Sequence, residues 1–479
     1  MIDFIDELKW RGLFHQCTDE ELLRHHLGTG VRRAYVGYDP TADSLTIGNL
    51  VTIMMLVHFR RAGHEPVVVM GGGTGLIGDP SGKSAERQLQ TEAMVRANVE
   101  AQRGIFERVF GNAEAVGGLP LRGGHDAHSA EREAGEERSG MRPPRSGRPP
   151  TILNNLDWLG KLGYLEALRD IGKHFSVNMM IQKDSVRERL HNRDQGISYT
   201  EFSYMILQSY DYLVLFRDYA KYGLDGRVTL QMGGSDQWGN IVGGVDLIRR
   251  DEELRGYQAV GPGRVSYPNK AFGLTAPLVT KADGGKFGKT ESGAIWLSPH
   301  RTSPYAYYQF WLNATDADVG RFLRIFTLHS KEAIEAIEAE HARDPGARHA
   351  QRELARAATA LLHGEAEMHR AEAAAKALFS GEISGLSEPE LNEVFASAPS
   401  SSHDRKLLSG EGVALVDLLP ETTLCKSKRE AREFLASGSV MVNSRKASAE
   451  ERLKEGDLLH GKVIALRRGK KSWHVTRWG

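Results

Sequence analysis

The sequence has few of the residues that mark disulfides, metal clusters or membrane segments. Its two cysteines, Cys17 and Cys425, are far apart, and neither belongs to a Cys-x-x-Cys or Cys/His cluster. This argues against structural zinc and favours a reducing compartment. No uninterrupted apolar run is long enough to cross a bilayer, and the chain starts with acidic residues where a secretory signal would be basic. We therefore expect a soluble, cytoplasmic protein with no metal site and no membrane partner.

Net charge is also lacking. Lys+Arg and Asp+Glu both total 62, so the formal net charge is +0. The whole molecule therefore has no field that would attract nucleic acid, and such a partner must be recognised by local patches. With 479 residues the chain is too long for one hydrophobic core, and we expect roughly two to four domains.

An alternation of strands and helices marks the first part of the chain. Residues 33–38 and 65–70 have the composition of buried strands, and residues 50–61 between them that of a helix. Strand, helix and strand within about 30 residues form the βαβ unit of a parallel, doubly wound sheet, whose ligands bind beyond the carboxyl ends of its strands. We predict a Rossmann-type α/β catalytic domain over residues 1–303.

The composition changes along the rest of the chain. Residues 117–150 are rich in Gly, Pro, Arg and Glu and poor in large apolar side chains, which predicts a disordered insertion; a basic RNA-contacting arm is the less favoured alternative. Residues 304–380 are rich in Ala, Glu and Arg and predict a helical domain. Residues 381–410 have a linker composition, and residues 411–479 have the composition of a compact, basic domain.

Gly73, Gly75 and Gly78 form a G-x-G-x-x-G pattern after a predicted strand. The pattern makes an NAD-dependent oxidoreductase one alternative, although alone it is weak. Asp79 and a proline follow at once and indicate more loop, whereas a dinucleotide fold has a helix here. Close packing of helix and sheet is an equally good reason for any one of these glycines.

Residues 35–50 have the sequence YVGYDPTADSLTIGNL. A strand end, a turn with hydroxyl and carboxylate groups, and a glycine at a helix opening suit a nucleotide triphosphate. The segment resembles the first signature of class I aminoacyl-tRNA synthetases in its tyrosyl form. The family core is His-Ile-Gly-His, but here both histidines are replaced, by Thr46 and Asn49. Asn49 can still donate a hydrogen bond to a ribose oxygen and Thr46 one to a phosphate, both without an imidazolium charge.

Residues 280–290 have the sequence TKADGGKFGKT. Lys286 and Lys289 can close over a leaving pyrophosphate and neutralise charge that develops in the transition state. The segment resembles the family's mobile lysine loop, and a solvated basic turn is the alternative. Residues 277–279 before it are apolar and predict a strand that brings the loop to the same sheet edge.

On a helix, Tyr204, Gln208 and Asp211 would share one face. Apolar neighbours surround them, which favours a pocket over a solvated surface. The resemblance implies that Tyr204, Gln208 and Asp79 hold the ammonium of tyrosine and that Asp211 and Tyr35 bond its phenol. It further implies that Gln237, in the segment QMGGSDQWGN, lies near the carboxylate.

The resemblance extends to domains, further residues and partners. It implies that residues 304–380 form an anticodon-side domain and that residues 411–479 form a small α+β RNA-binding domain. It implies catalytic roles for Lys286, Lys289, Thr41 and Thr46. It implies ATP contacts from Asp39, Gly48, Asn49, Gly234, Asp236, Lys286, Lys289 and Thr290. ATP would enter as its Mg²⁺ complex, with no tightly bound cofactor, and the partners would be tRNA(Tyr), tyrosine, ATP and a second copy of the chain.

The tail is basic. Residues 424–435 predict a short basic helix, followed by a hairpin-like unit at 438–443. This resembles a compact RNA-binding module of a ribosomal small-subunit protein and of bacterial tyrosyl enzymes. Residues 461–479 add several lysines and arginines and no acid, a stripe that suits phosphate contacts or merely a solvated surface. Because Thr46 and Asn49 depart from the family pattern, a non-catalytic RNA-binding paralogue is a further alternative.

Overall fold

The structure is a computed structural model that describes residues 2–79, 90–115, 150–183, 186–187, 197–254, 270–285, 287–290, 293–396, 398–469 and 472–479. Apart from Pro150, the predicted insertion at 117–150 lies outside the described residues, as does Lys286. The chain divides into two compact units. One comprises Met1–Thr302 and Ala314–His363, and the other comprises Ser303–Asn313 and Gly364–Gly479.

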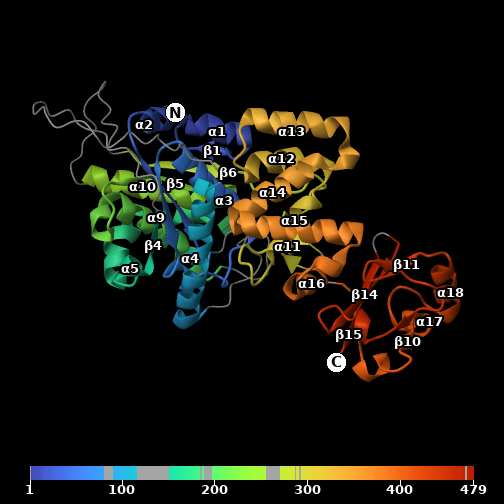
Figure 1. The fold of residues 1–479 in the computed structure, drawn as a ribbon. Helices are drawn as coiled ribbons and strands as arrows, with labels where there is room; N and C mark the ends of the chain where they lie inside the picture. The colour runs from blue at the N-terminus through green and yellow to red at the C-terminus, as the bar shows by residue number, and fades with distance from the viewer. Residues whose placement is uncertain are drawn as a thin grey trace, which may run out of the picture. The chain divides into compact units, whose positions relative to one another are not determined.

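The first unit is built on a six-stranded sheet (Figure 1) with the order β1-β6-β5-β2-β3-β4. Its strands are β1 (Gln16–Cys17), β2 (Arg33–Tyr38), β3 (Glu65–Met70), β4 (Thr151–Asn154), β5 (Val228–Gly234) and β6 (Phe272–Ala276). All neighbours are parallel except β1 and β6. The predicted strands at 33–38 and 65–70 are confirmed. The strand order reverses between β2 and β5, and ligands of doubly wound sheets bind at such a reversal.

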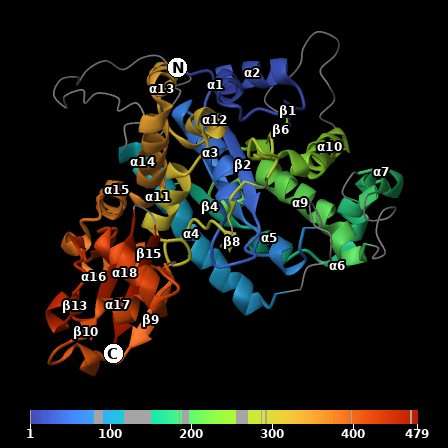
Figure 2. The same ribbon diagram turned by 90° about the vertical axis from the view of Figure 1, so that its right-hand side faces the viewer.

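Helices cover both faces of this sheet. Figure 2 shows α3 (Ile47–Arg61) on one side of β2, and α9 (Tyr199–Arg217) and α10 (Trp238–Leu254) on the other. The helix predicted at 50–61 begins three residues earlier, because Thr46 and Asn49 form a capping box at its start. The strand predicted at 277–279 is wrong: β6 ends at Ala276, and the lysine loop follows from there.

Residues 304–380 are helical, as predicted, but they do not form a unit of their own. The helices α12 (Asp316–Phe326), α13 (Lys331–Arg343) and α14 (His349–His363) belong to the first unit. There α12 packs on α1 (Phe4–Arg11) and α3, while α14 packs on α4 (Glu92–Ala115). The helices α11 (Pro304–Leu312) and α15 (Glu365–Ser380) pack on each other in the second unit.

The second unit carries a five-stranded sheet with the order β12-β11-β14-β15-β9. Its strands are β9 (Ser400–His403), β11 (Val440–Val442), β12 (Arg445–Lys446), β14 (Val463–Arg468) and β15 (Ser472–Trp478). Of these, β11, β14 and β15 share an apolar core with α17 (Leu415–Leu418) and α18 (Lys428–Ala436). The predicted linker at 381–410 is therefore largely structured. It contains α16 (Glu388–Val394), and β9 pairs in parallel with β15, whose edge supplies hydrogen bonds to the serine-rich backbone.

No helix among the described residues is both long and apolar enough to span a membrane.

Candidate active site

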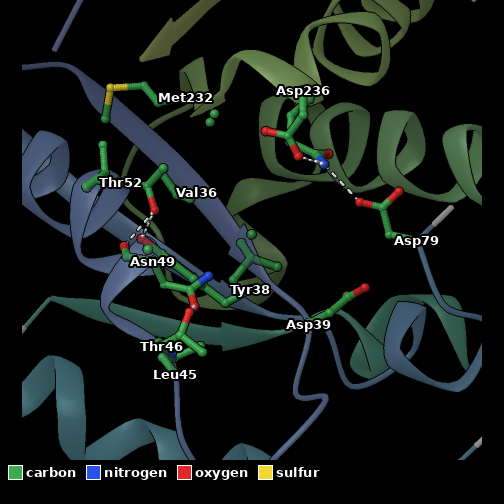
Figure 3. A pocket seen from close by; sticks show the side chains of 18 of the residues that line it. Val36, Tyr38, Asp39, Leu45, Thr46, Asn49, Thr52, Asp79, Met232 and Asp236 are labelled. Carbon is green, nitrogen blue, oxygen red and sulfur yellow. Dashed lines mark hydrogen bonds between the residues drawn. The ribbon is translucent and has the colours of Figure 1, made fainter. Parts of the chain in front are cut away.

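A pocket of about 790 Å³ lies where the carboxyl ends of β2 and β5 meet the start of α3 (Figure 3). It brings together most of the residues predicted for the site. Those that line it are Tyr35, Asp39, Thr41, Thr46, Gly48, Asn49, Asp79, Tyr204, Gln208, Asp211, Gly234, Asp236 and Gln237. Segments that are far apart in the sequence converge here because parallel strands present their carboxyl ends at one sheet edge.

Asp211 lies buried on α9 with both carboxylate oxygens hydrogen-bonded. Asn155 Nδ2 donates to one oxygen over 2.9 Å, and Trp158 Nε1 donates to the other over 2.6 Å. Burial raises the pKa of Asp211 to about 7, although the two donors oppose the rise. The site therefore holds a carboxyl group that titrates near neutral pH.

Tyr35 extends from β2 into the same region of the pocket. Its side chain is 1% exposed, and its hydroxyl has no hydrogen-bond partner in the structure. Burial raises the pKa of this phenol well above its usual value, and the Asp211 carboxylate adds to the shift. An unpaired buried hydroxyl is costly, so this one fits a ligand that brings its own polar group.

Carboxylates dominate the rest of the pocket. Tyr204 Oη donates to Asp39 over 3.0 Å, and Gln237 Nε2 donates to Asp79 over 2.8 Å. Burial raises the pKa of Asp236. Among the described residues that line the pocket, none is Lys, Arg or His. The pocket therefore suits a cationic group of a ligand, such as an ammonium.

Thr46 and Asn49 form a hydrogen-bonded pair at the start of α3, and Figure 3 shows them side by side. The backbone N–H and the hydroxyl of Thr46 both donate to Asn49 Oδ1, each over 3.0 Å. We expected the Thr46 hydroxyl to donate to a phosphate, but its proton is directed to Asn49 instead. Residues three apart in a helix's first turn lie on the same side, which explains the pairing.

The lysine loop packs against α12 and α3. Phe287 lies 5.2 Å and 5.1 Å, ring centre to ring centre, from Phe322 and Phe326 of α12. Gly288 has a φ of 76°, and a Cβ there would collide with Ile47. The loop therefore needs glycine at this position to lie against the start of α3.

Of the predicted loop residues, Lys286 lies outside the part of the chain that the structure describes. Lys289 and Thr290 form the short strand β7 (Lys289–Thr290), and the Lys289 side chain is exposed. Lys289 does not line the pocket. The structure therefore does not bring Lys289 into the pocket with the other predicted residues.

Among the residues that were missed in the sequence are three that donate hydrogen bonds to Asp39 or Asp211. Besides Asn155 and Trp158, these include Thr74, whose hydroxyl donates to Asp39 over 2.8 Å and accepts from Asn155 Nδ2 over 3.0 Å. Asn155 and Trp158 follow directly after β4. Polar residues at a strand end are the signal that identified the other segments, and it could have identified these two.

The glycines after β3 serve internal packing. A Cβ on Gly71 would collide with Asp39, and one on Gly73 would press on Leu159. A short 3₁₀ turn, Thr74–Leu76, follows, and the next helix among the described residues is α4. A dinucleotide-binding loop would lead directly into a helix, so the structure does not support that interpretation.

The described residues include no group of three or more His, Cys, Asp or Glu side chains placed to hold a metal ion.

The basic residues of the tail divide into two groups. On α18, Arg429 is 89% exposed, and Lys428 and Arg432 are exposed beside it. In the sheet, Arg467 is buried against Trp473, and Lys462 forms an ion pair with Glu388 over 2.6 Å. The predicted stripe at 461–479 is therefore partly engaged within the fold. On α18, Lys428 and Arg429 are ion-paired as well, with Asp417 over 2.7 Å and Glu433 over 3.1 Å, but both cations stay exposed.

Comparisons with known proteins agree with this geometry. Residues 29–380 match the model of class I tRNA synthetases (W and Y), and residues 390–476 match that of the tyrosine–tRNA ligase SYY-like C-terminal domain. The tyrosine–tRNA ligases of Aliivibrio fischeri and Roseiflexus castenholzii are 44% and 43% identical to this chain, over 99% and 100% of both sequences. A C-terminally truncated mitochondrial tyrosyl-tRNA synthetase of Aspergillus nidulans covers 79% of this chain and 95% of its own, with a TM-score of 0.65 and 29% identity. The chain therefore belongs to the tyrosine–tRNA ligases, a family of class I tRNA synthetases.

Proposed function

We propose that this chain activates L-tyrosine with ATP, giving tyrosyl-adenylate and pyrophosphate, and then transfers the tyrosyl group to the 3′ end of tRNA(Tyr). The observation that carries the proposal is the buried pair of Asp211 and the unpartnered Tyr35 hydroxyl in a carboxylate-lined pocket. A phenol would donate to Asp211 and accept from Tyr35, which would pair the hydroxyl that is otherwise unpartnered.

The rest of the tyrosine molecule suits the remaining polar groups. An ammonium would lie among Asp79, Tyr204 and Gln208, and the described residues that line the pocket include no lysine or arginine. Gln237 would lie near the carboxylate. Its Nε2 lies 2.8 Å from Asp79, so a small rotation would exchange one oxygen partner for another.

ATP would bind at the open side of the pocket as its Mg²⁺ complex. Gly48 and Asn49 open α3, where the helix dipole favours a phosphate, and Gly234 and Asp236 lie at the end of β5, close to where a ribose would pass. Asp39 would complete the nucleotide contacts. Lys286, Lys289, Thr290 and Thr41 would stabilise the triphosphate as pyrophosphate leaves.

The tyrosine carboxylate would itself attack the α-phosphate. No side chain is then needed as nucleophile or general base, and catalysis would come from positioning and from charge stabilisation in the transition state. Mg²⁺ would enter with ATP as part of the substrate.

We further propose that the chain acts as a homodimer. Seven of the twelve exposed large apolar side chains among the described residues lie between residues 164 and 199, Tyr164 and Leu165 being 65% and 79% exposed. Clustered exposed apolar residues of this kind mark interfaces. Sedimentation should give twice the chain mass, and Leu165→Lys should shift it towards the monomer while Leu407→Lys, elsewhere on the surface, does not. A monomeric wild-type protein would exclude the dimer.

The decisive test is tyrosine-dependent exchange of pyrophosphate into ATP by the full-length chain. We expect exchange with tyrosine and none without it. Lys289→Ala should lower the rate roughly 10²-fold, because it removes a full charge that opposes the developing negative charge; Lys331→Ala on α13 is the matched control. A folded wild-type protein that binds tRNA but shows no exchange would instead be a non-catalytic paralogue.

A further inference from the structure

Thr46 and Asn49 stand where the first signature of the family has its two histidines. In this chain they form a closed pair, with two donors of Thr46 directed to one acceptor, Asn49 Oδ1. Both side chains line the pocket.

The chemistry of the donors fixes the orientation of the Asn49 amide. The backbone N–H of Thr46 can only donate, so the amide atom that faces it must be the oxygen. The hydroxyl proton of Thr46 is donated to the same oxygen. A phosphate oxygen is an acceptor, so a hydroxyl that already donates its single proton to Asn49 cannot donate a hydrogen bond to it as well.

Backbone hydrogen bonds hold this part of the chain in place. Ile47 N donates to Ile295 O over 2.9 Å, and Leu297 N donates to Leu45 O over 2.8 Å. Thr46 itself forms an isolated β-bridge with Trp296. With the backbone fixed on both sides, the main remaining freedom of the pair is rotation of the two side chains.

We propose that Thr46 is a positioning residue: its hydroxyl holds Asn49 Oδ1, so that Asn49 Nδ2, the donor already expected to contact an oxygen of ATP, keeps its direction. The inference rests on the proposed use of ATP and names how this chain replaces the histidine pair. The amide Nδ2 lies opposite Oδ1, so fixing Oδ1 against Thr46 fixes the direction in which Nδ2 donates. Without the Thr46 hydroxyl, only the backbone N–H of Thr46 holds Asn49 Oδ1, so the amide is held less firmly and Nδ2 is aligned with the nucleotide for less of the time.

A double-mutant cycle tests the proposal. The proteins are the wild type, Thr46→Val, Asn49→Ala and the double variant, with Thr46→Ser as the conservative control that keeps the hydroxyl. Each is assayed for pyrophosphate exchange and for affinity towards a non-hydrolysable ATP analogue. Thermal unfolding is followed for all, because loss of a helix cap lowers stability, and rates are compared where every variant is folded.

We expect Thr46→Val to lower kcat/KM for ATP by roughly fivefold to tenfold, the range of one neutral hydrogen bond. Thr46→Ser should stay near the wild type, and tyrosine affinity should not change. In the Asn49→Ala background, Thr46→Val should have no further effect. If Thr46→Val lowers kcat/KM for ATP equally in the wild-type and Asn49→Ala backgrounds, Thr46 contacts ATP directly and the proposal is wrong. An Asn49→Ala variant with the wild-type kcat/KM for ATP would contradict it as well.

The analogue affinities separate this inference from the proposed function. If the wild-type protein shows no exchange, the proposed activation fails, while the coupling of Thr46 and Asn49 is still measured by nucleotide binding. Equal affinities for all four proteins of the cycle would then contradict the positioning role.

Discussion

At the scale of single residues, Asp211 links burial to specificity. Its carboxylate accepts two hydrogen bonds from Asn155 and Trp158, and its pKa is nevertheless about 7 because it is removed from water. The folded state thus holds a proton that the unfolded chain releases near its ordinary pKa. The unliganded fold therefore loses stability as pH rises from about 4 to about 7.

Tyrosine binding should show the opposite dependence on pH. A phenol donates best to the ionised carboxylate, so binding favours deprotonated Asp211. Below about pH 7 the affinity for tyrosine should fall roughly tenfold per pH unit, and above it the affinity should level off. Titration calorimetry from about pH 5.5 to about pH 8.5 measures this.

The matched variant is Asp211→Asn, which keeps the shape and has no titratable proton. Its weaker tyrosine binding should be independent of pH in this range. A wild-type affinity that is flat across pH 7 would show that Asp211 does not accept the phenol proton in the way proposed.

The sequence identified the polar residues that belong to motifs, but not the residues that hydrogen-bond to them. Tyr35, Tyr204, Gln208 and Asp211 were found because a resemblance and a helical face pointed to them. Asn155 and Trp158 were not found, although Asn155 directly follows β4 and polar residues at a strand end had marked the other segments of the site. The pairing of Thr46 with Asn49 also escaped, because a spacing of three does not reveal where a proton is donated.

At the scale of elements, the lysine loop depends on α12. Beyond the contacts of Phe287, Ala282 N donates to Asp318 Oδ1 over 2.9 Å, and Arg321 donates to the carbonyl of Thr280. These contacts join both ends of the loop to one helix. The position of the loop should therefore follow that of α12.

Phe287→Ala should slow adenylate formation roughly tenfold without changing tyrosine affinity. Complete burial of a phenylalanine side chain contributes about 1.5–3 kcal/mol, and Phe287 is partly buried, so its loss removes a part of this and lets the loop occupy other positions. Stopped-flow measurement of adenylate formation checks this, and Phe379→Ala, which removes an 85% exposed ring, is the control. Unchanged kinetics in the folded Phe287 variant would mean that packing on α12 does not position the loop.

Elements with their own apolar pattern were predictable. The strands at 33–38 and 65–70 were correct to the residue because each is a valine- or tyrosine-containing run buried on both sides. The strand β9 was not, since Ser400–His403 forms a strand only by pairing with the distant β15. Composition indicates local propensity and carries no information about a pairing strand far away in the sequence.

At the scale of the whole molecule, the pocket and the exposed cations of α18 belong to different units. Every residue that lines the pocket lies in the first unit, whereas the exposed arginines and lysine of α18 lie in the second. The sequence could not predict this division, because α12 and α14 join the first unit through packing on α3 and α4 rather than through any boundary in composition.

A chain that ends at residue 396 should form tyrosyl-adenylate at nearly the wild-type rate and charge tRNA(Tyr) at least about tenfold less well. The cut precedes β9, so the five-stranded sheet is removed whole and not left without its edge strand. Adenylate formation and aminoacylation are measured on the same preparation. If the truncated and full chains aminoacylate tRNA(Tyr) equally well across a salt series, the tail does not contribute to tRNA recognition.

The most direct test of the central claim is the ratio of exchange rates with tyrosine and with phenylalanine. Sites that hydrogen-bond a substrate hydroxyl reject the analogue that lacks it by about 10⁴–10⁵-fold, and tyrosyl-tRNA synthetases are themselves the standard example. With Asp211 and the unpartnered Tyr35 hydroxyl buried in the pocket, kcat/KM for tyrosine should exceed that for phenylalanine by roughly 10⁴-fold or more. Comparable values for the two amino acids in the folded wild-type chain would contradict the account of this pocket.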